Sequence, residues 1–594
     1  MTSRIFVALM LAFSAAPPAA ADRIVGTGEL AGTVTAPGAV TAAKVFARKA
    51  DSNITYMVFT EGGKFSAVNV MPGRYEVWVE TPGYASDKQT VDVAAGATAT
   101  AAVALKLADT GPLYIGTRMT TRKVETFDQI YPPGRGRDIL ERSCFRCHGF
   151  NFLPAMPQHR EAWGAAVDYM TTAPRWGIPG KAPFLSTEEF TAEDRDVLLD
   201  YLAKNIGDGM PERVVGGDPE PPKDEAVLGK AMIIQYDFAA TDALTERVTQ
   251  ETAFDSKGNV WVTNVRKESA LIKLDPETGK YVDYPMPNKA WSPHGLIVDG
   301  DDTIWAATLK GGLVQFDPKT GNYDAYGKTH RDSGGLSPFL DSKGNAYWTD
   351  IRINEIGMWK RADKSWKKFQ SPSPVGSPYG LVVDHQDKMW YAEFHACTIV
   401  RFDPDTEVLT PFKSPSAPCA IRRPGADSKG NIWYGIWDKG RIEKLDPNAG
   451  TVTAYQVPVQ FAAPYDTWVA PDDTVWSSSD SYMIHLDPAT ATLQYYPTPQ
   501  RTDQPKITIT RDGAVWYPPR GFASGGGAPA SAAVLYPDKS KMTTFRAYYA
   551  PNDPNAIGQR YKGPRANVAG ISNDGGDKIR EIEQHNPDIG NAGD

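Results

Sequence analysis

Alternating apolar and polar positions dominate residues 22–110. In stretches such as "KFSAVNVMPGRYEVWVETPGY" and "QTVDVAAGATATAAVAL" apolar and polar residues take turns, and glycine-rich breaks separate the runs. A period of two is typical of strands that bury only one face. The pattern predicts a small N-terminal β-sandwich. It carries no constellation of reactive side chains, so we expect a structural or docking role for this domain.

The period changes to that of helices in residues 127–207. "RGRDILERSCFRCH" and "EAWGAAVDYM" place apolar residues three or four positions apart, and "TAEDRDVLLDYLAKNIG" begins at a Thr/Glu cap. Such spacing predicts amphipathic helices, and therefore a small all-α domain. Residues 208–226 are rich in proline and charge, which indicates a linker to the next domain.

Residues 227–550 repeat themselves at intervals of 40 to 44 residues. The repeats align on one aromatic residue each: Trp261, Trp305, Tyr347, Trp390, Trp433, Trp476 and Trp516. Seven repeats with four short strands each predict a seven-bladed β-propeller. Segments 231–238 and 542–549 both have the pattern of outer strands, so the closure of the ring stays open. Residues 551–594 lack apolar periodicity, and we expect a tail that is disordered or lies over the surface of the protein.

Three copies of "DSKGN" begin at Asp255, Asp341 and Asp427. They resemble calcium-binding loops at first sight. We interpret each as a single hairpin turn with glycine in the left-handed conformation, because the spacing fits one turn between two strands.

The N-terminus indicates the compartment. Residues 1–21 contain Arg4, an apolar run and "AAA" before Asp22, the order of a secretory signal peptide. This apolar run is shorter than the about 20 residues that a membrane-spanning helix needs, and no later segment is long and apolar enough. The formal charge of −8 provides no basic face for nucleic acid or anionic lipid. We expect a soluble periplasmic protein.

Cys144, Cys147 and His148 form a Cys-x-x-Cys-His motif in helical sequence. In an exported protein this motif is typical of covalent haem c attachment, with two thioethers on one helical turn and the histidine on the iron. A structural disulfide, a redox-active cysteine pair and half of a zinc site are the alternatives. Zinc would need a second ligand pair of similar spacing, which the chain lacks, and a redox pair would need a βαβ setting.

Candidates for the second axial ligand follow downstream: Met156, His159, Met170 and Met210. The region resembles small class I cytochrome c domains, in which a methionine follows a tryptophan-bearing helix. "REAWGAAVDYM" supplies Arg160, Trp163 and Met170 in that order. The resemblance implies Met170 as the ligand, with Met156 as the next choice. Simple core packing of Met170 is the alternative interpretation.

Two further resemblances concern the other domains. "GKFSAVNVMPGRYEVWVETPGY" is similar to carboxypeptidase regulatory-like domains, which implies an immunoglobulin-like fold. "SPHGLIVDGDDTIW" and "SPYGLVVDHQDKMWYAEFHACTIVRF" resemble the propellers of streptogramin B (virginiamycin B) lyases. The lyase resemblance implies His294 as a general base. Here Ser292 and Pro293 precede it, where the family has Glu-Pro, and the loop after Trp305 has no acid at the family's position. Two blades on, Glu393 keeps that position but Tyr379 replaces the histidine, so the lyase constellation is split.

Loops at one face of the disc gather the candidate residues of the propeller. From the blade geometry we expect these side chains there: His294, Tyr379, Cys419, Tyr465, Asp350, Glu393, His395 and Asp480, with Glu251, Arg422 and Arg520 nearby. His294, Glu393 and His395 could bind a divalent metal, or one of them could accept a proton. Glu393 and His395 point the same way if their stretch is extended. The sequence marks of pyrroloquinoline-quinone dehydrogenases are absent.

Cys397 and Cys419 lie on neighbouring blades at this same face. In an oxidising compartment we expect them to form a disulfide, and a copper-binding or catalytic thiol is the alternative.

Taken together, the motifs favour an exported oxidoreductase that oxidises a small organic substrate at the propeller and transfers electrons through a haem c domain to a soluble carrier. Two other classes stay open. One is a non-catalytic electron-transfer or docking protein for a partner dehydrogenase, and the other is a lyase with an accessory haem.

Overall fold

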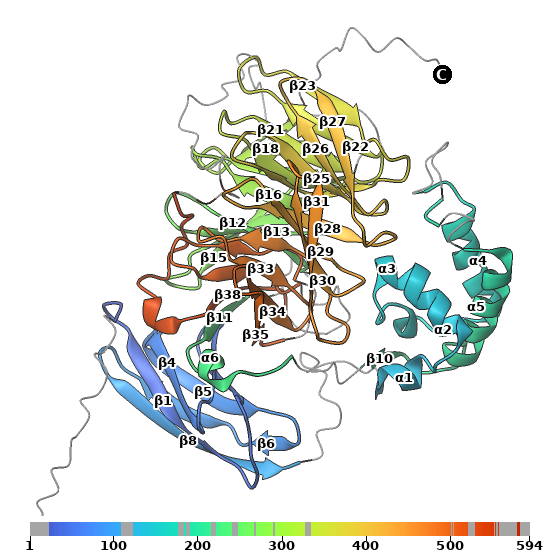
Figure 1. Ribbon diagram of the computed structural model, residues 1–594. Coiled ribbons are helices and arrows are strands. Elements are labelled where there is room, and N and C mark those ends of the chain that lie inside the picture. The colour runs from blue at the N-terminus through green and yellow to red at the C-terminus, as the bar shows by residue number, and fades with distance from the viewer. Residues whose placement is uncertain are drawn as a thin grey trace, which may run out of the picture.

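The computed structural model describes residues 23–108, 123–175, 183–185, 190–215, 221–239, 247–265, 269–288, 291–326, 334–500, 502, 504–520, 529–551, 553, 556 and 579–581. The expected signal peptide and most of the expected tail lie outside these residues, as does part of the expected linker. The chain is mainly β, with a sandwich, a helical unit and a large ring of sheets (Figure 1).

The N-terminal domain consists of eight strands, as its alternating pattern predicts: β1 (Gly28–Thr35), β2 (Lys44–Lys49), β3 (Ile54–Phe59), β4 (Lys64–Val70), β5 (Gly73–Glu80), β6 (Tyr84–Ser86), β7 (Gln89–Val93) and β8 (Thr98–Leu107). One sheet has the order β4-β1-β8-β6, and the other contains β3-β2-β5-β7. Val45, Tyr56 and Val77 are among the side chains that fill the core between them. The immunoglobulin-like β-sandwich is therefore present.

The helical unit follows in residues 123–215. Its elements are β9 (Lys123–Glu125), α1 (Phe127–Ile130), α2 (Arg135–Ile139), the π-helical turn η1 (Leu140–Cys144), α3 (Phe145–His148), the 3-10 turn η2 (Leu153–Ala155), α4 (Arg160–Thr171), α5 (Ala192–Asn205) and β10 (Arg213–Val215). Strands β9 and β10 pair in parallel and close the unit. Thr191 caps α5, as its sequence predicts, but its reciprocal hydrogen-bond partner is Asp194 and not a glutamate.

Seven four-stranded antiparallel sheets form the propeller-type domain at the seven predicted repeat positions. The first six are β12 (Thr249–Phe254), β13 (Val260–Asn264), β14 (Ala270–Leu274), β15 (Tyr281–Pro285); β16 (Pro293–Val298), β17 (Ile304–Thr308), β18 (Gly312–Asp317), β19 (Asn322–Tyr326); β20 (Gly335–Leu340), β21 (Ala346–Asp350), β22 (Glu355–Trp359), β23 (Trp366–Gln370); β24 (Pro378–Val383), β25 (Met389–Glu393), β26 (Thr398–Asp403), β27 (Val408–Lys413); β28 (Ile421–Ala426), β29 (Ile432–Ile436), β30 (Arg441–Asp446), β31 (Thr451–Gln456); and β32 (Thr467–Val469), β33 (Val475–Ser478), β34 (Tyr482–Asp487), β35 (Thr492–Pro497). A short strand, β39 (Ile579–Glu581), adds to the edge of β19.

The seventh sheet closes the ring. It contains β36 (Thr508–Ile509), β37 (Val515–Tyr517), β38 (Ser531–Tyr536) and, as its outer strand, β11 (Met232–Asp237), which follows the short helix α6 (Glu225–Leu228). Of the two candidate outer strands, the N-terminal one takes this place. The segment Met542–Tyr549 forms no strand and follows a 3-10 turn, η5 (Lys539–Lys541). Beyond β11 the sheet continues into β3 of the sandwich, so the two domains share one eight-stranded sheet.

A recurring hydrogen bond explains the conserved spacing within the repeats. The indole Nε1 of Trp305 donates to Asp299 at 3.0 Å, that of Trp390 to Asp384 at 2.7 Å, and that of Trp433 to Asp427 at 3.0 Å. Each aspartate directly follows an inner strand and lies six residues before its tryptophan, so the bond fastens the turn to the second strand. The "DSKGN" segments are hairpin turns, as predicted, and Gly258 has a φ of +74°.

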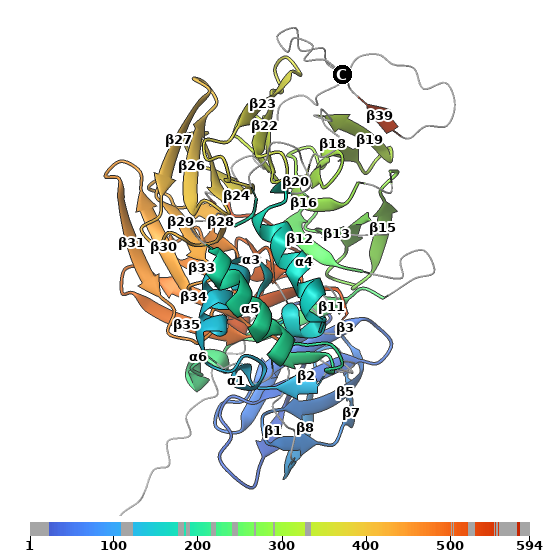
Figure 2. The same cartoon turned by 90° about the vertical axis from the view of Figure 1, so that its right-hand side faces the viewer.

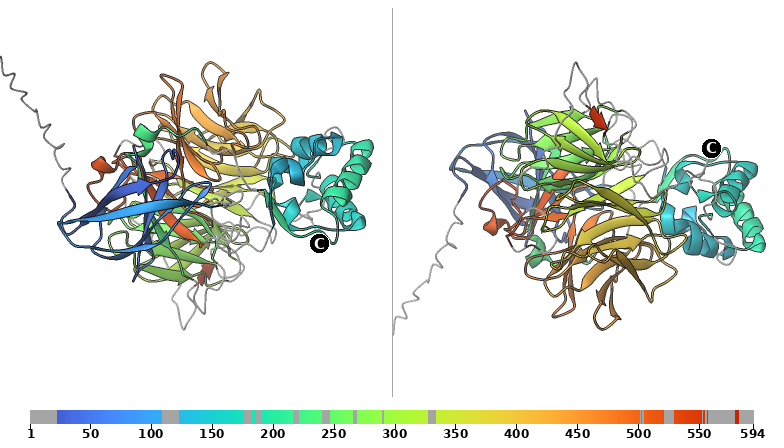
Figure 3. Two further views of the ribbon diagram at one scale, coloured as in Figure 1. Left: turned by 90° about the horizontal axis from the view of Figure 1, so that it is seen from below. Right: turned by 90° about the horizontal axis from the view of Figure 1, so that it is seen from above.

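Helices of the unit lie over one end of the propeller ring (Figure 2). In Figure 1 α3 lies on the side of the unit that faces the propeller, while α4 and α5 lie on the outer side. The sandwich packs elsewhere on the ring, as the view from below shows (Figure 3). Within the described residues, no helix has the length and apolar character that a membrane crossing requires.

Candidate functional site

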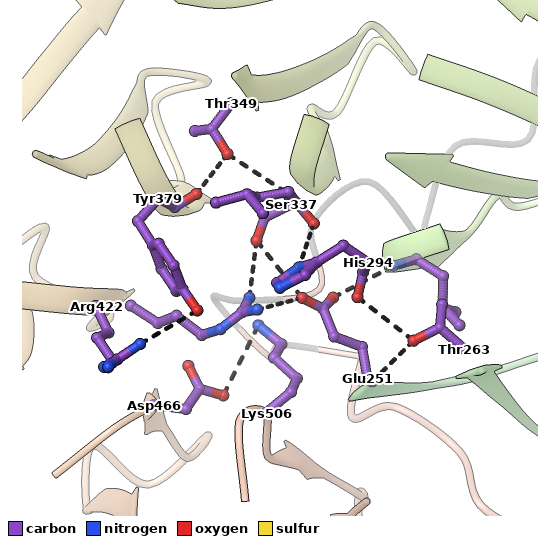
Figure 4. A network of polar contacts seen from close by, with 12 residues as sticks. Glu251, Thr263, His294, Ser337, Thr349, Tyr379, Arg422, Asp466 and Lys506 are labelled. Carbon is purple, nitrogen blue, oxygen red and sulfur yellow. Dashed lines mark hydrogen bonds and ion pairs between the residues drawn. The ribbon is translucent and has the colours of Figure 1, made fainter. Parts of the chain in front are cut away.

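The inner strands of the propeller bring a cluster of polar side chains together near its axis (Figure 4). These strands contact one another in series from β12 to β32. Five of them have a shift in register near their first residues, and each shift falls at a member of the cluster: Glu251 in β12, His294 in β16, Ser337 in β20, Tyr379 in β24, and Arg422 and Arg423 in β28. β-Bulges redirect side chains and are frequent next to active sites. The repeated bulge therefore positions the cluster.

Arg423 and Glu251 form a buried ion pair across the axis. Arg423 Nη2 lies 2.6 Å from the Glu251 carboxylate, and both side chains are 2% exposed. Arg423 also donates to Ser337 Oγ at 2.8 Å, and the backbone N–H of Leu296 donates to Glu251 at 3.3 Å. Burial raises the pKa of the Glu251 carboxyl, and the charges of Arg423 and Lys506 oppose that rise. The pair thus ties strands β12, β16, β20 and β28 together.

Two tyrosine hydroxyls meet beside this ion pair. Tyr379 Oη and Tyr465 Oη are 2.5 Å apart, and Arg422 Nη1 donates to both, at 3.4 and 3.2 Å. Burial would raise the pKa of the Tyr379 phenol, but the positive charges of Arg422 and Arg423 outweigh it, so this pKa lies below its usual value. Burial, together with Tyr379, raises the pKa of Tyr465. Either hydroxyl can be the donor in this contact.

His294 lies edge-on to Tyr379, with ring centroids 6.2 Å apart. Its Nδ1 is 3.1 Å from the Leu336 carbonyl oxygen, and because a carbonyl only accepts, Nδ1 carries the proton. Among the described residues Nε2 has no hydrogen-bond partner. Burial, with the nearby Arg423 charge, lowers the pKa of the imidazole well below its usual value. His294 is a neutral imidazole whose Nε2 lone pair can accept a proton or a hydrogen bond.

Aromatic rings surround the Arg422 guanidinium. It lies 4.3 Å from the centroid of Trp437, 4.4 Å from that of Tyr465 and 4.9 Å from that of Phe394. We call the neighbouring apolar side chains the apolar rim; it consists of Leu309, Leu336, Ile351, Phe394, Ala420 and Trp437. Leu309, Ile351 and Trp437 remain partly exposed, so the rim is in contact with solvent. This end of the axis combines an apolar rim with buried hydroxyl and guanidinium donors.

Hydrogen bonds attach the helical unit to this face. Arg175, which is 1% exposed, donates to the backbone carbonyls of Val375 at 2.9 Å and Pro374 at 3.2 Å. Arg146 donates to the carbonyl of His395 at 3.4 Å. Both arginines flank the loops before β24 and after β25, close to where Tyr379 enters the cluster.

Aromatic contacts bring the Cys-x-x-Cys-His segment against the same face. Phe150 lies 5.0 Å from Phe461, measured between ring centroids. A Cβ at Gly149 would be 3.5 Å from Cη2 of Trp437, so the residue after His148 touches the ring that packs on Arg422. Figure 1 shows α3 at this boundary. Trp437 therefore bridges the cysteine segment and the axis cluster.

The stretch from Glu393 to His395 is not extended. Strand β25 ends at Glu393 and a turn follows over 394–397, so the condition under which the two side chains would point the same way is not met. The Glu393 carboxylate is fully buried and accepts from Ser371 and Ser373. The His395 ring packs near Phe184, with centroids 5.7 Å apart. No group of three or more His, Cys, Asp or Glu side chains within the described residues is arranged to hold a metal ion.

Two other expected members have hydrogen-bond partners that are not members of the cluster. Asp350 is fully buried and accepts from the backbone N–H of Gly334 at 2.7 Å, with Lys368 Nζ at 3.5 Å. The backbone carbonyl of Asp480 accepts from Thr502. Arg520 contributes its positive charge to the surroundings of His294.

Cys397 and Cys419 form a disulfide, as predicted, and it joins the fourth and fifth blades. Cys144 is a free thiol. Met170 is half-buried near the end of α4, and its backbone carbonyl accepts from Leu185. Met156 is 40% exposed, and His159 caps α4.

Sequence reasoning missed Arg423, Trp437 and Arg175. The sequence does contain a signal for Arg423. The segment "IRRPGA" places two arginines in a strand that is otherwise apolar, and a buried charge requires a partner. The other two act between segments far apart in the sequence, and no local pattern reports that.

Fold and site together define a multidomain, mainly β protein with an immunoglobulin-like domain and a propeller-type domain whose axis carries a buried Glu–Arg–Tyr–His cluster. Residues 230–487 match the virginiamycin B lyase family, and residues 29–106 match the carboxypeptidase regulatory-like domain. The two resemblances inferred from the sequence are thus confirmed.

Individual relatives are more distant. Peptidyl-alpha-hydroxyglycine alpha-amidating lyase 1 of Drosophila melanogaster is 31% identical over 109 residues, which are 17% of this chain; the chain spans about a fifth (20%) of that relative's length. A streptogramin B lyase structure is 18% identical with a TM-score of 0.45, covering 52% of this chain and 97% of its own. Virginiamycin B lyase from Staphylococcus aureus, as its selenomethionine form, is 17% identical with a TM-score of 0.45, covering 51% and 99%.

Proposed function

We propose that this chain is a periplasmic haem c protein that oxidises a small organic substrate at the axis cluster. The helical unit would pass the electrons to a soluble electron-transfer protein. One observation carries the proposal: the Cys-x-x-Cys-His segment lies against the propeller face, next to Trp437, and Trp437 packs on Arg422 of the cluster. An electron donor at the axis and an acceptor on α3 would therefore be neighbours.

The residues of the helical unit fit a covalent haem. Cys144 and Cys147 are one turn apart on η1 and α3, the Cys144 thiol is free, and His148 follows directly. Several side chains at the core of the unit stay partly exposed and offer a surface for a flat apolar group: Cys144, Phe145, Phe150 and Leu185. When bound, haem c supplies a one-electron acceptor, with His148 and, by our proposal, Met170 as iron ligands.

The chain's own residues would prepare the substrate. Neutral His294 offers Nε2 as a proton acceptor, and the Tyr379 hydroxyl, flanked by Arg422, offers a hydrogen-bonding partner with a lowered pKa. Docking of the helical unit through Arg175 and Arg146 reduces the access of water to this end of the axis. Glu393, which is satisfied by serine hydroxyls, would hold the loop in place rather than react.

The test has two stages. Protein produced in cells competent for cytochrome maturation is first denatured, separated on a gel and stained for haem; Cys144→Ser with Cys147→Ser is the control. We expect a stained full-size band that the control lacks. Alcohols, aldehydes and phenols are then added to the protein under anaerobic conditions. We expect them to reduce the haem, and the absorption spectrum of the reduced haem measures this. Reduction only by a partner dehydrogenase would identify a docking protein instead, and an unstained band would refute the proposal.

A lyase is the second candidate, because residues 230–487 match the virginiamycin B lyase family and His294 is a neutral base in the matching position. The loop after Trp305 supplies no acid, which argues against the lyase's metal site. Cleavage of a cyclic depsipeptide ester with no change in the haem spectrum would favour this candidate. Its loss in His294→Asn, with haem content retained, would assign the base.

A further inference from the structure

In the hydroxyl pair at the axis, one of the two hydroxyl hydrogens has no acceptor among the described residues. Tyr379 and Tyr465 together bring two hydroxyl hydrogens, and their 2.5 Å contact uses one of them. Their oxygens otherwise accept from Arg422, and among the described residues neither hydroxyl donates to a further acceptor. A buried donor without an acceptor is unfavourable, because nothing compensates the loss of its hydrogen bond to water. The pair can therefore donate to an oxygen that the described part of the chain does not supply.

Charge at the same place favours an oxygen with negative character. Arg422 already donates to both hydroxyls, and the carboxylates nearby belong to other cations, Glu251 to Arg423 and Asp466 to Lys506. The same positive charges lower the pKa of the Tyr379 side chain, which is itself a phenol at this position.

The surroundings above the donors are apolar and aromatic. The apolar rim offers Phe394 and Trp437, whose ring centroids lie 4.9 and 4.3 Å from the Arg422 guanidinium, and Trp437 remains partly exposed. Aromatic rings favour edge-to-face or offset contact with another ring. A ligand that combines a ring with an acidic oxygen matches both parts of the site, whereas an aliphatic alcohol matches neither the rim nor the charge.

We propose that this end of the axis binds a small phenol, with the phenol oxygen on the Tyr379–Tyr465 hydroxyl pair and Arg422 and its ring against the apolar rim. Binding is as the phenolate: the O–H bond breaks, its electron pair stays on the oxygen, and the proton goes to solvent, so no oxidant is needed. The proposal deepens the proposed function by naming its substrate class, and it rests on that function only for the later loss of an electron from the bound phenolate.

The experiment is calorimetric titration of the full-length, haem-loaded protein at pH 7.5. The probes are 4-methylphenol, its methyl ether 4-methylanisole, and 4-methylbenzoate. We expect the phenol to bind at least tenfold more tightly than either other probe. We also expect the binding heat to change with the ionisation enthalpy of the buffer. The slope of this dependence should correspond to about one proton released per site. Equal binding of the ether, or tighter binding of the benzoate, overturns the proposal.

Variants test the residues. Tyr465→Phe should weaken 4-methylphenol about tenfold and leave 4-methylanisole unchanged. Tyr517→Phe is the matched control, because its hydroxyl in β37 is also buried, has no partner among the described residues, and belongs to a different core. An equal loss in both variants overturns the assignment of Tyr465. If Tyr465→Phe does not fold, the three probes on the wild-type protein still decide the proposal.

The two proposals fail separately. Selective phenol binding with no reduction of the haem keeps the binding site and refutes the oxidoreductase. Haem reduction by an alcohol or aldehyde, with no phenol binding, refutes the substrate class and keeps the oxidoreductase.

Discussion

Replacing Arg423 by methionine should destabilise the propeller strongly and in a pH-dependent way. Arg423 and Glu251 are each 2% exposed and lie 2.6 Å apart. Removing one partner of a buried pair leaves an uncompensated charge, which costs about 3–5 kcal/mol. Since Arg423 donates to Ser337 as well, we expect the upper part of this range at pH 7.5. Replacing both partners, Arg423→Met with Glu251→Met, removes both charges and should cost at least about 2 kcal/mol less than the single change.

The pH dependence follows from the Glu251 carboxyl. Its pKa is already raised by burial, and the Arg423 charge is the largest influence that lowers it. In Arg423→Met the folded-state pKa rises further above the unfolded value. A carboxyl of this kind favours folding below its unfolded pKa and loses that contribution as pH rises through the folded pKa. The cost of the substitution should therefore be largest at pH 7–8 and decrease toward pH 5.

Urea unfolding followed by tryptophan fluorescence, at pH 5 and pH 7.5, measures these differences for wild type, single variant and double variant. Two results would refute the reasoning. One is a double variant as unstable as Arg423→Met, which would mean that lost packing rather than the unpaired charge is responsible. The other is a cost that does not change with pH.

Three further predictions concern other parts of the molecule. The disulfide Cys397–Cys419 closes a loop with a sequence separation of 22, and replacing both cysteines by alanine should lower the unfolding free energy by about 3 kcal/mol. Urea titration measures this loss, and a loss below about 1 kcal/mol would contradict the loop-entropy argument. Arg175→Met should increase hydrogen exchange across the face under the helical unit, because Arg175 donates to the propeller carbonyls of Pro374 and Val375. The exposed Arg160→Met should not, because Arg160 donates to Asp200 within the helical unit; equal protection in both variants would contradict the Arg175 contact. The pKa of His294 lies well below 6.5 in the folded protein, so below pH 6.5 the unfolded chain binds a proton at this residue that the folded chain does not. The unfolding free energy should therefore fall by up to about 1.4 kcal/mol per pH unit below pH 6.5. His294→Asn should make that slope shallower by this amount when unfolding is measured as a function of pH, and an unchanged slope would exclude His294 as its source.

Much of the propeller could be predicted because its signals are local. The aromatic residue of each repeat, the glycine of each "DSKGN" turn and the aspartate six residues before Trp305 act within one blade. The same repeat places inner-strand residues such as His294 and Tyr379 at one end of the axis, so their meeting could be inferred. The disulfide followed from neighbouring blades in the same way.

Contacts over long sequence separations could not be predicted. Glu251 and Arg423 are four blades apart along the chain, and only the closed ring brings them together. The helical unit docks through carbonyls at Pro374 and Val375, which leave no trace in the sequence. The sequence left open whether the stretch from Glu393 to His395 is extended, because a period-of-two pattern over a few residues determines strand ends poorly. The strand ends at Glu393.

The sheet shared by the sandwich and the seventh blade has a consequence for how the protein can be divided. Other outer strands, such as β23 and β31, are partly exposed along their length, whereas every residue of β11 is buried. Cutting away the N-terminal domain would expose the backbone donors and acceptors of "MIIQYD" together with its apolar side chains. An unpaired, apolar strand edge promotes aggregation. The sandwich therefore protects the ring against self-association, and a propeller expressed without it should precipitate.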